Sequence, residues 1–195
     1  MSRRRPSDGL QRPASPAADV RIDPVPRRGA LGSLRREIPS VWTGITDARL
    51  REILPRHAAR GGFRFFAARS GGQLVGLAYG YLGAPGQWWH DIVSAAMDEG
   101  QRRRWLSPGH FEVVELHVHP QFRRRGIGAR LHDALLEDLA SRTAVLSTQT
   151  DNAPARALYR SRGWEIVVPE VRFAAEGDLY AILALDLAAA RGAGA

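Results

Sequence analysis

Three consecutive arginines and two glycines stand together in residues 123–128 (RRRGIG). Residues 111–119 before them have the composition of a strand, and Leu131, Leu135 and Leu139 after them have the spacing of one helix face. A strand that runs through a glycine turn into a helix directs free backbone amides and the positive end of the helix dipole at one point. Glycines let a ligand approach the backbone, and arginines add positive charge. The pattern predicts a diphosphate site.

Other phosphate-binding patterns fit this segment less well. The chain contains no lysine, which excludes a Walker-type loop. A dinucleotide fingerprint needs a small residue where Leu131 stands and an acidic residue at the end of the next strand. An ordinary glycine turn beside solvated arginines remains the alternative to a binding loop.

A second segment narrows the identity of the ligand. Residues 152–159 (NAPARALY), followed by Gly163 and Trp164, resemble the Asn-x-x-Ala-x-x-Leu-Tyr-x-x-x-Gly-aromatic signature of the GCN5-related N-acetyltransferase (GNAT) family. Residues 123–128 resemble that family's Arg/Gln-x-x-Gly-x-Gly loop for acetyl-CoA. The two motifs occur in the family's order, with a helix and a strand between them, and together span about residues 111–168.

The resemblance implies a role for each matching residue. Backbone amides of the loop would hold the pyrophosphate of acetyl-CoA; the loop comprises Arg123, Arg124, Arg125, Gly126, Ile127 and Gly128. Leu116 and Val118, on the preceding strand, would contact the pantetheine arm, and the amide of Val118 would stabilise the oxyanion of the thioester. Asn152 would bind the pantetheine region. Tyr159 would protonate the leaving thiolate or hydrogen-bond its sulfur, unless it is only a core aromatic.

The attacking amine is protonated at neutral pH, so the reaction needs a base. Side chains alternate along a strand, which places Glu115, His117 and His119 on the face opposite Leu116 and Val118. Members of the family often use a carboxylate on this strand. We therefore predict Glu115 as the base, ahead of His117 and then Glu112. The His-x-His pair lacks an evident third ligand, so we expect no metal.

The remaining elements predict an α/β fold with one mixed, mostly antiparallel sheet flanked by helices, which is the fold of the family. Leu31, Leu34 and Ile38 mark a helix that Pro39 stops, and Asp47 caps a second helix that Pro55 interrupts. A hairpin turning at residues 70–72 precedes the strand at 111–119. Shorter strands follow at residues 144–148, 164–168 and 179–187, with a helix between 152 and Gly163.

Residues 83–110 exceed an ordinary connection and contain a glycine-bounded helix, so we expect an insertion on the acceptor side. Trp88, Trp89 and His90 lie in it. Two adjacent tryptophans cannot both face one core, so one either lines a pocket or anchors the insertion over a sheet edge. Tyr79 and Tyr81 are weaker candidates for the acceptor site, and residues 102–104 form a solvated helix end.

Composition limits the other function classes. The formal charge is +8, but residues 1–36 hold nine arginines and three aspartates and so carry most of it. We expect residues 1–30 to form a disordered arginine- and proline-rich tail, in which residues 20–22 would make at most a short edge strand before Pro24 and Pro26. The domain is predicted over residues 31–188, with a flexible tail at 189–195. No apolar run suits a membrane span, and the absence of cysteine excludes disulfides and favours a cytoplasmic protein.

These observations predict a single-domain acetyltransferase that transfers an acetyl group from acetyl-CoA to a primary amine in a ternary complex. Without cysteine, a thioacyl-enzyme is excluded. A small-molecule amine, an amino acid or a protein N-terminus would each serve as acceptor. Two alternatives stay open: a degenerate acyl-CoA-binding module of the same fold, and a nucleic-acid-associated protein that acts through its tail, which its charge distribution disfavours. Family members are often dimers, so a homodimer is the assembly to test.

Overall fold

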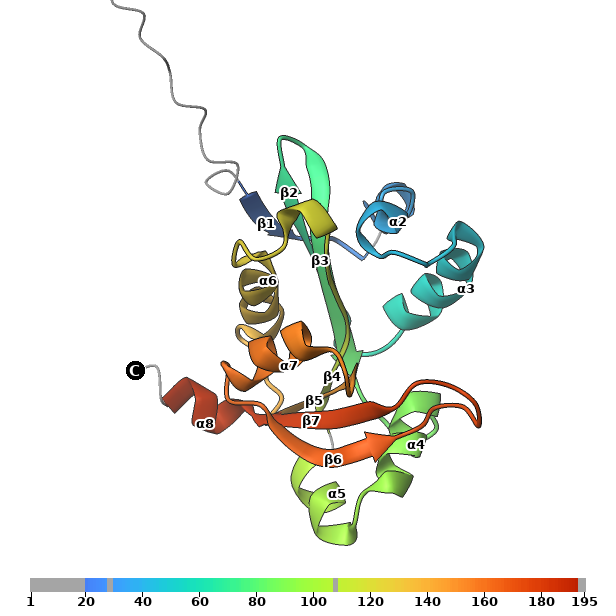
Figure 1. The fold of residues 1–195 in the computed structure, drawn as a ribbon, viewed down its shortest axis with the longest axis vertical. Coiled ribbons are helices and arrows are strands. Elements are labelled where there is room, and N and C mark those ends of the chain that lie inside the picture. The colour runs from blue at the N-terminus through green and yellow to red at the C-terminus, as the bar shows by residue number, and fades with distance from the viewer. Residues whose placement is uncertain (1–19, 28–29, 107–108, 193–195) are drawn as a thin grey trace, which may run out of the picture.

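The computed structural model describes residues 20–27, 30–106 and 109–192, which form one twisted seven-stranded sheet with helices on both faces (Figure 1). The spatial order is β1-β2-β3-β4-β5-β7-β6. All neighbours are antiparallel except β4 and β5, which confirms the predicted mixed sheet. The strands are β1 (Val20–Pro24), β2 (Arg64–Ser70), β3 (Gln73–Leu82), β4 (Phe111–Val118), β5 (Thr143–Gln149), β6 (Glu165–Val171) and β7 (Tyr180–Asp186).

The sheet splits at its only parallel pair. β4 and β5 are paired at Phe111–Ala144 and Glu112–Val145, and beyond these residues the two strands diverge. Figure 1 shows β2, β3 and β4 running steeply through the upper half, while β5, β7 and β6 cross the lower half. Because residues 113–118 of β4 have no partner strand on this side among the described residues, their edge is open.

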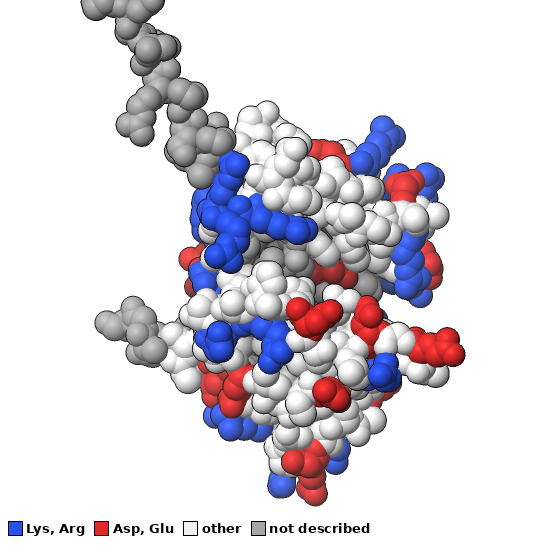
Figure 2. Space-filling view, viewed as in Figure 1, with Lys and Arg blue, Asp and Glu red and all other residues white. Residues whose placement is uncertain are grey.

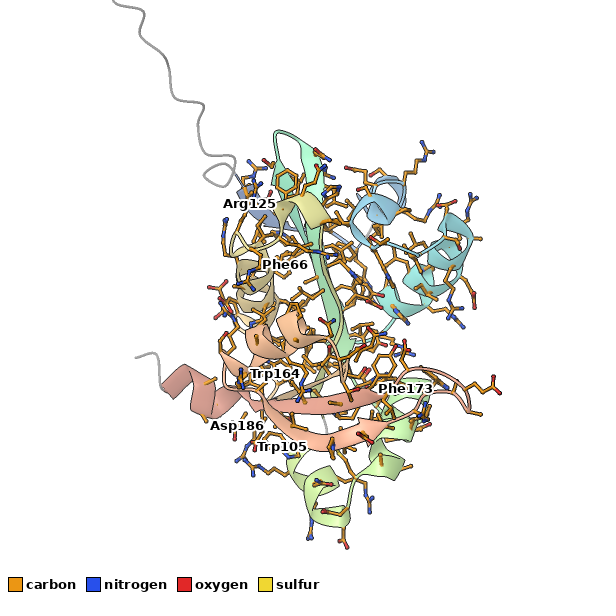
Figure 3. The ribbon with its side chains drawn as sticks, in the orientation of Figure 1. Phe66, Trp105, Arg125, Trp164, Phe173 and Asp186 are labelled. Carbon is orange, nitrogen blue, oxygen red and sulfur yellow. The ribbon has the colours of Figure 1, made fainter. Side chains whose placement is uncertain are left out.

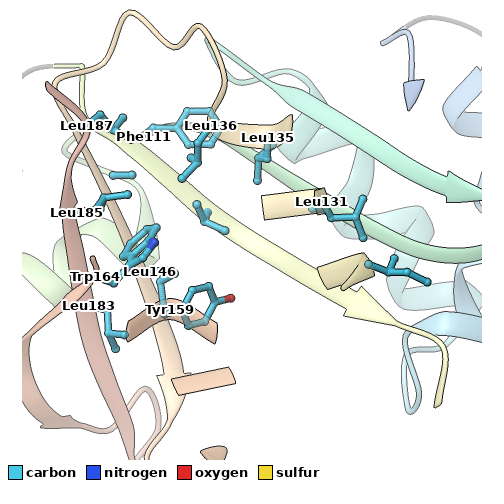
Figure 4. Close-up of a cluster of buried hydrophobic side chains, with 14 of the residues drawn as sticks. Phe111, Leu131, Leu135, Leu136, Leu146, Tyr159, Trp164, Leu183, Leu185 and Leu187 are labelled. Carbon is cyan, nitrogen blue, oxygen red and sulfur yellow. The ribbon is translucent and has the colours of Figure 1, made fainter. Parts of the chain in front are cut away.

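Helices cover each half of the sheet on both faces. α1 (Ala30–Leu34), α2 (Ile38–Val41) and α3 (Asp47–Ala58) pack against β2 and β3 through a core that includes Leu50, Phe65 and Leu77. α6 (Ile127–Leu136) and α7 (Ala153–Arg160) cover the other face, where Figure 4 shows Leu131, Leu135, Tyr159 and Trp164 in one buried cluster. α4 (Trp88–Ala96) and α5 (Glu99–Trp105) cover β5, β6 and β7 through Val93, Met97 and Trp105.

Four features of the helices differ from the predictions. Pro39 does not stop a helix but lies in the first turn of α2, where its missing N–H costs no helical hydrogen bond. Pro55 does not interrupt α3, which continues to Ala58 with Leu50, Ile53 and Leu54 buried against the sheet. Its N-cap is Thr46, whose hydroxyl accepts from the amide of Arg49, and not Asp47. Within residues 83–110 there are two helices instead of one, because Asp98 and Gln101 form a capping box that starts α5.

The ordered domain is longer than predicted at both ends. β1 lies inside the segment assigned to the N-terminal tail and contains residues 20–22, where a short edge strand was possible, and all five of its residues pair with β2. Pro24 is compatible with this strand because β1 is at the edge of the sheet. α8 (Leu187–Gly192) extends past the predicted boundary at residue 188, and Leu187 is buried. The rest of the predicted tails, residues 1–19 and 193–195, lies outside the described residues. Among the helices of the described part, none is long and apolar enough to cross a membrane.

Candidate active site

A β-bulge in β4 brings two glutamates to the same face of the sheet. Tyr79 pairs with Glu115 and Tyr81 pairs with Glu112, so Val114 is an extra residue between them. Cross-strand partners project to one face, and Tyr79 and Tyr81 are two residues apart and share that face. Glu112 and Glu115 therefore share it too, although residues three apart on a regular strand point to opposite faces.

These glutamates line a cavity of about 720 Å³ between α3, α4 and the strands on either side of the split. Its aromatic walls contain both tryptophans of the insertion, Trp88 and Trp89, where the sequence led us to expect at least one beside a pocket or an interface. Trp89 reaches across to β5, where its Nε1 donates to Ser147 Oγ at 3.0 Å. The aromatic side chains that line the cavity are Trp42, Tyr81, Trp88, Trp89, Phe173 and Tyr180, and the ionisable ones are Arg49, Glu52, Arg56, His57, Arg60, Glu112 and Glu115.

Glu115 and His117 form a directly hydrogen-bonded pair at this face. Glu115 Oε2 lies 2.8 Å from His117 Nε2, and the His117 ring stacks on Trp42 with centroids 4.8 Å apart. Burial raises the pKa of Glu115 above its usual 4.5, and the hydrogen bond and charge of His117 oppose that shift. A carboxylate with a raised pKa inside a cavity is suited to accept a proton from an amine. His119 does not join this pair, because its Nδ1 accepts from the amide of Gln121 at the end of the strand.

The open edge of β4 presents the backbone of Leu116 and Val118. The amide of His119 donates to the carbonyl of Val75 in β3 at 2.9 Å, so the polar backbone groups of His119 point toward β3. Backbone direction alternates along an antiparallel strand, and the groups of Leu116 and Val118 therefore point away from β3, into the split. Their side chains lie beside Gly128, where an added Cβ would be 3.6 Å from Leu116 Cδ2 and 3.7 Å from Val118 Cγ2.

The loop between β4 and α6 presents a run of free amides. Arg124 and Gly126 have φ of 61° and 75°, which turns the chain sharply into α6. Within the described part of the chain, the amides of residues 124–129 donate no hydrogen bond. Arg123 Nε donates to the Val118 carbonyl at 3.2 Å. Figure 2 shows basic side chains gathered over the region where Figure 3 labels Arg125. Free amides, a helix N-terminus and exposed guanidinium groups together fit a diphosphate.

Across the split from β4, α7 contributes Tyr159. Its ring is 7% exposed and packs on Trp164 with centroids 5.6 Å apart, while its hydroxyl makes no hydrogen bond to the described residues. In Figure 4 the hydroxyl points away from Trp164, toward the space beside β4. Burial, with a smaller contribution from the charge of Glu115, raises the pKa of Tyr159, so the phenol is protonated at neutral pH and can donate.

Asn152 begins α7 as its N-cap. Its Oδ1 accepts from the amide of Ala155 at 3.2 Å, which leaves the side-chain NH₂ group for a ligand. The predicted site residues thus form two groups. Glu115 lines the cavity and has His117 as its hydrogen-bond partner, whereas Leu116, Val118, the loop and Tyr159 face the split or its end.

The match to known proteins decides the family. The model of the acetyltransferase (GNAT) family matches residues 31–164. The chain belongs to the GNAT family. Among curated GNAT relatives, it is 35% identical over 128 residues to the GCN5-like protein acetyltransferase Rv2170 of Mycobacterium tuberculosis, an alignment that covers 62% of each chain. It is also 35% identical over 103 residues to N-alpha-acetyltransferase RimI of the same organism, covering 53% of this chain and 52% of RimI. The matches therefore span between half and two thirds of these relatives.

Solved GNAT structures share the fold at low sequence identity. The ribosomal-protein-S18-alanine N-acetyltransferase of Escherichia coli superposes with a TM-score of 0.60 at 16% identity, over 86% of this chain and 94% of that chain. The acetyltransferase yncA of Salmonella typhimurium, solved with its cofactor acetyl-CoA, gives 0.57 at 16% identity, over 87% and 94%. These likenesses confirm the predicted GNAT fold.

Sequence reasoning missed several residues that line this GNAT cavity, and two of them, His57 and Arg60, contact tyrosines of β3. His57 Nδ1 lies 3.1 Å from the hydroxyl of Tyr79, and burial lowers its pKa from 6.5 to about 4. The guanidinium of Arg60 lies 4.4 Å from the centre of the Tyr81 ring. A signal for His57 was present, because it continues the helical spacing of Leu50, Ile53 and Leu54. Arg60 follows the helix in an irregular segment, and no pattern marked it.

Proposed function

We propose that this GNAT protein transfers an acetyl group from acetyl-CoA to a primary amine by direct attack within a ternary complex. The observation that carries the proposal is the arrangement of β4. Its bulged face presents Glu115 to a cavity, while its open edge presents the backbone groups of Leu116 and Val118 to the split. An acceptor and a donor can therefore meet at one strand without displacing each other.

The donor side rests mainly on backbone amides that make no hydrogen bond to the described residues. The amides of residues 124–129 and the neighbouring arginines would hold the diphosphate, and Leu116 and Val118 would pair with the amide groups of pantetheine. Bound acetyl-CoA supplies an activated acetyl thioester. The solved relative that contains acetyl-CoA supports this choice of donor, since it has the same fold.

On the acceptor side, each residue has one proposed task. Glu115 accepts the proton of the amine, and His117 holds the carboxylate in place through the 2.8 Å contact. Tyr159 keeps its proton at neutral pH and donates it at the sulfur side of the split. Because the chain has no cysteine, the acetyl group passes to the amine without a thioacyl-enzyme.

The test is amine-dependent release of CoA by the full chain. The amines should include small molecules, amino acids and peptides with a free N-terminus or a lysine, because two relatives are named for acetylating proteins or N-termini. We expect at least one class to support turnover and Glu115→Gln to slow it. Glu99→Gln, on the exposed surface of α5, is the matched control. If acetyl-CoA binds but no amine releases CoA, the protein is a binding module instead of an enzyme.

A further inference from the structure

Negatively and positively charged side chains occupy different parts of the cavity wall. Glu112 and Glu115 lie on its inner wall, on β4, whereas the arginines Arg49, Arg56 and Arg60 come from α3 and the residues after it. We propose that the acceptor is an anionic amine, a small molecule that carries its amine at one end and a carboxylate or phosphate-like group at the other. This inference rests on the proposed function and names the acceptor class of the same site.

The inner wall has an excess of acceptor oxygen atoms. Glu112 is 2% exposed, and its Oε1 makes no hydrogen bond to the described residues, its nearest ionisable contact being His110 Nε2 at 3.7 Å. Glu115 adds a second carboxylate three residues along the strand, with His117 as its hydrogen-bond partner. The Glu115 side chain keeps 26% of its surface exposed, so a group with N–H bonds that enters the cavity can pair with it, and Glu112 adds a second negative charge on the same face. An ammonium group carries such bonds.

The arginine side has an excess of positive charge. Glu52 is the carboxylate among these arginines, and it pairs with Arg49 at 2.7 Å and with Arg56 at 3.0 Å. One carboxylate thus serves two arginines. Arg60 has no carboxylate partner among the described residues: its Nη1 donates to Gln87 Oε1 at 3.1 Å and its guanidinium lies over Tyr81. The remaining guanidinium donors of Arg60 are available to an anion.

The aromatic side chain of Tyr81 lies next to both kinds of charge. Tyr81 is the direct cross-strand partner of Glu112, and Arg60 lies over the ring of the same Tyr81. An acceptor that extends from Glu115 to Arg60 must therefore pass the Tyr81 ring, and an aromatic body suits that path. Four more aromatic rings are available to hold such a body. Phe173 lies at their centre, with ring centroids 5.6 Å from Trp88, 6.5 Å from Trp89 and 5.1 Å from Tyr180.

This arrangement favours a small anionic molecule over the amine of a protein. A lysine side chain or a peptide N-terminus carries no obligatory anion one ring away from its amine, so it would leave Arg60 without a counter-charge. An anionic amine pairs both ends at once, and an uncharged analogue loses one end. The choice among acceptor amines should therefore depend more on the presence of the anionic group than on the shape of the rest of the molecule.

The experiment compares para-aminomethylbenzoate with its uncharged benzamide and with the matching phosphonate. We expect the protein to use the benzoate or the phosphonate with a kcat/KM about tenfold or more above the benzamide, as for a charge-assisted hydrogen bond. The ratio of the two anions separates a carboxylate acceptor from a phosphate-like one. Arg60→Gln should bring the ratio of benzoate to benzamide kcat/KM close to one, while Arg103→Gln, on the outer surface of α5, should preserve the ratio of the unmodified protein.

Several results would overturn the inference. One is equal use of benzoate and benzamide by the unmodified protein. Another is an Arg60→Gln variant that lowers both to the same extent. A third is a peptide that is used better than either anion and is indifferent to Arg60. If no amine supports turnover, the proposed function fails. Calorimetric binding of the benzoate to the unmodified and Arg60→Gln proteins then decides the inference separately, and failure of the unmodified protein to bind it overturns the inference.

Discussion

At the scale of single residues, burial sets the protonation of the two groups assigned to proton transfer. Glu115 has a raised pKa and Tyr159 has a raised pKa, with burial as the largest cause in both. The same direction of pKa shift has opposite consequences for the two groups. A raised pKa brings the carboxyl closer to neutral pH, where it can exchange protons, and it keeps the phenol protonated.

The pH dependence of turnover follows from Glu115. The carboxyl must be ionised to accept a proton, so kcat/KM should fall as the pH decreases through its pKa, which lies above 4.5. Glu115→Gln should lower kcat/KM by about 10²–10⁴ and remove this acidic limb. His57 will not cause this fall in kcat/KM, because its pKa of about 4 leaves the imidazole neutral at higher pH. Initial rates of CoA release against pH measure it, and an unchanged limb in Glu115→Gln would assign the base elsewhere.

Tyr159 allows chemistry and packing to be separated. Its hydroxyl makes no hydrogen bond to the described residues, whereas its ring packs on Trp164 and His132. Tyr159→Phe should therefore lower kcat while the free energy of unfolding stays within about 0.5 kcal/mol of the unmodified protein. Tyr159→Ala, which deletes the ring, should cost about 3–5 kcal/mol. Urea unfolding and CoA release measure both, and full activity in Tyr159→Phe would reduce Tyr159 to a core residue.

At the scale of elements, the sequence predicted the identity of most strands and helices but not how they are aligned. β4 and the hairpin of β2 and β3 were predicted because their strand-forming residues are continuous. The bulge at Val114 was not predicted, because it depends on the register between β3 and β4 and leaves no local pattern. That bulge is what puts Glu112 on the face of Glu115. Proline is equally ambiguous, since Pro39 and Pro55 lie inside elements that packing maintains.

The start of α6 yields a matched pair of glycine variants. Gly126 has a φ of 75°, so Gly126→Ala should destabilise the protein by about 1 kcal/mol and weaken acetyl-CoA binding by turning the loop amides. Gly128 has a helical backbone, and a Cβ there makes only ordinary contacts with Leu116, Val118 and Leu158. Gly128→Ala should preserve binding and leave stability equal or higher. Urea unfolding with calorimetry measures both, and equal effects of the two substitutions would contradict the assigned role of Gly126.

At the scale of the whole molecule, the fold was predicted from two motifs, residues 123–128 and 152–164. Both motifs bind one ligand in the family they resemble, so the chain between them has to bring them to one site. The split between β4 and β5 and the full extent of the domain could not be predicted from the sequence. Pairing of β4 with β5 stops after Glu112, and no property of residues 113–118 alone indicates that their edge is open. The sequence allowed residues 20–22 at most a short edge strand within a tail, and their pairing with β2, which continues through Pro24, places them in the sheet.

The split leads to a prediction about local stability. The two halves of the sheet are joined at β4 and β5 by two residue pairs, so a ligand between the strands should protect backbone that is otherwise open. At 100 times its Kd, acetyl-CoA should stabilise the native state by about 2.7 kcal/mol. In hydrogen exchange we expect the strongest slowing in residues 113–118 and 124–129, and little in α8. A CoA fragment that lacks the pantetheine arm should protect the loop alone. Equal slowing in both segments with that fragment would mean that the arm does not lie along β4.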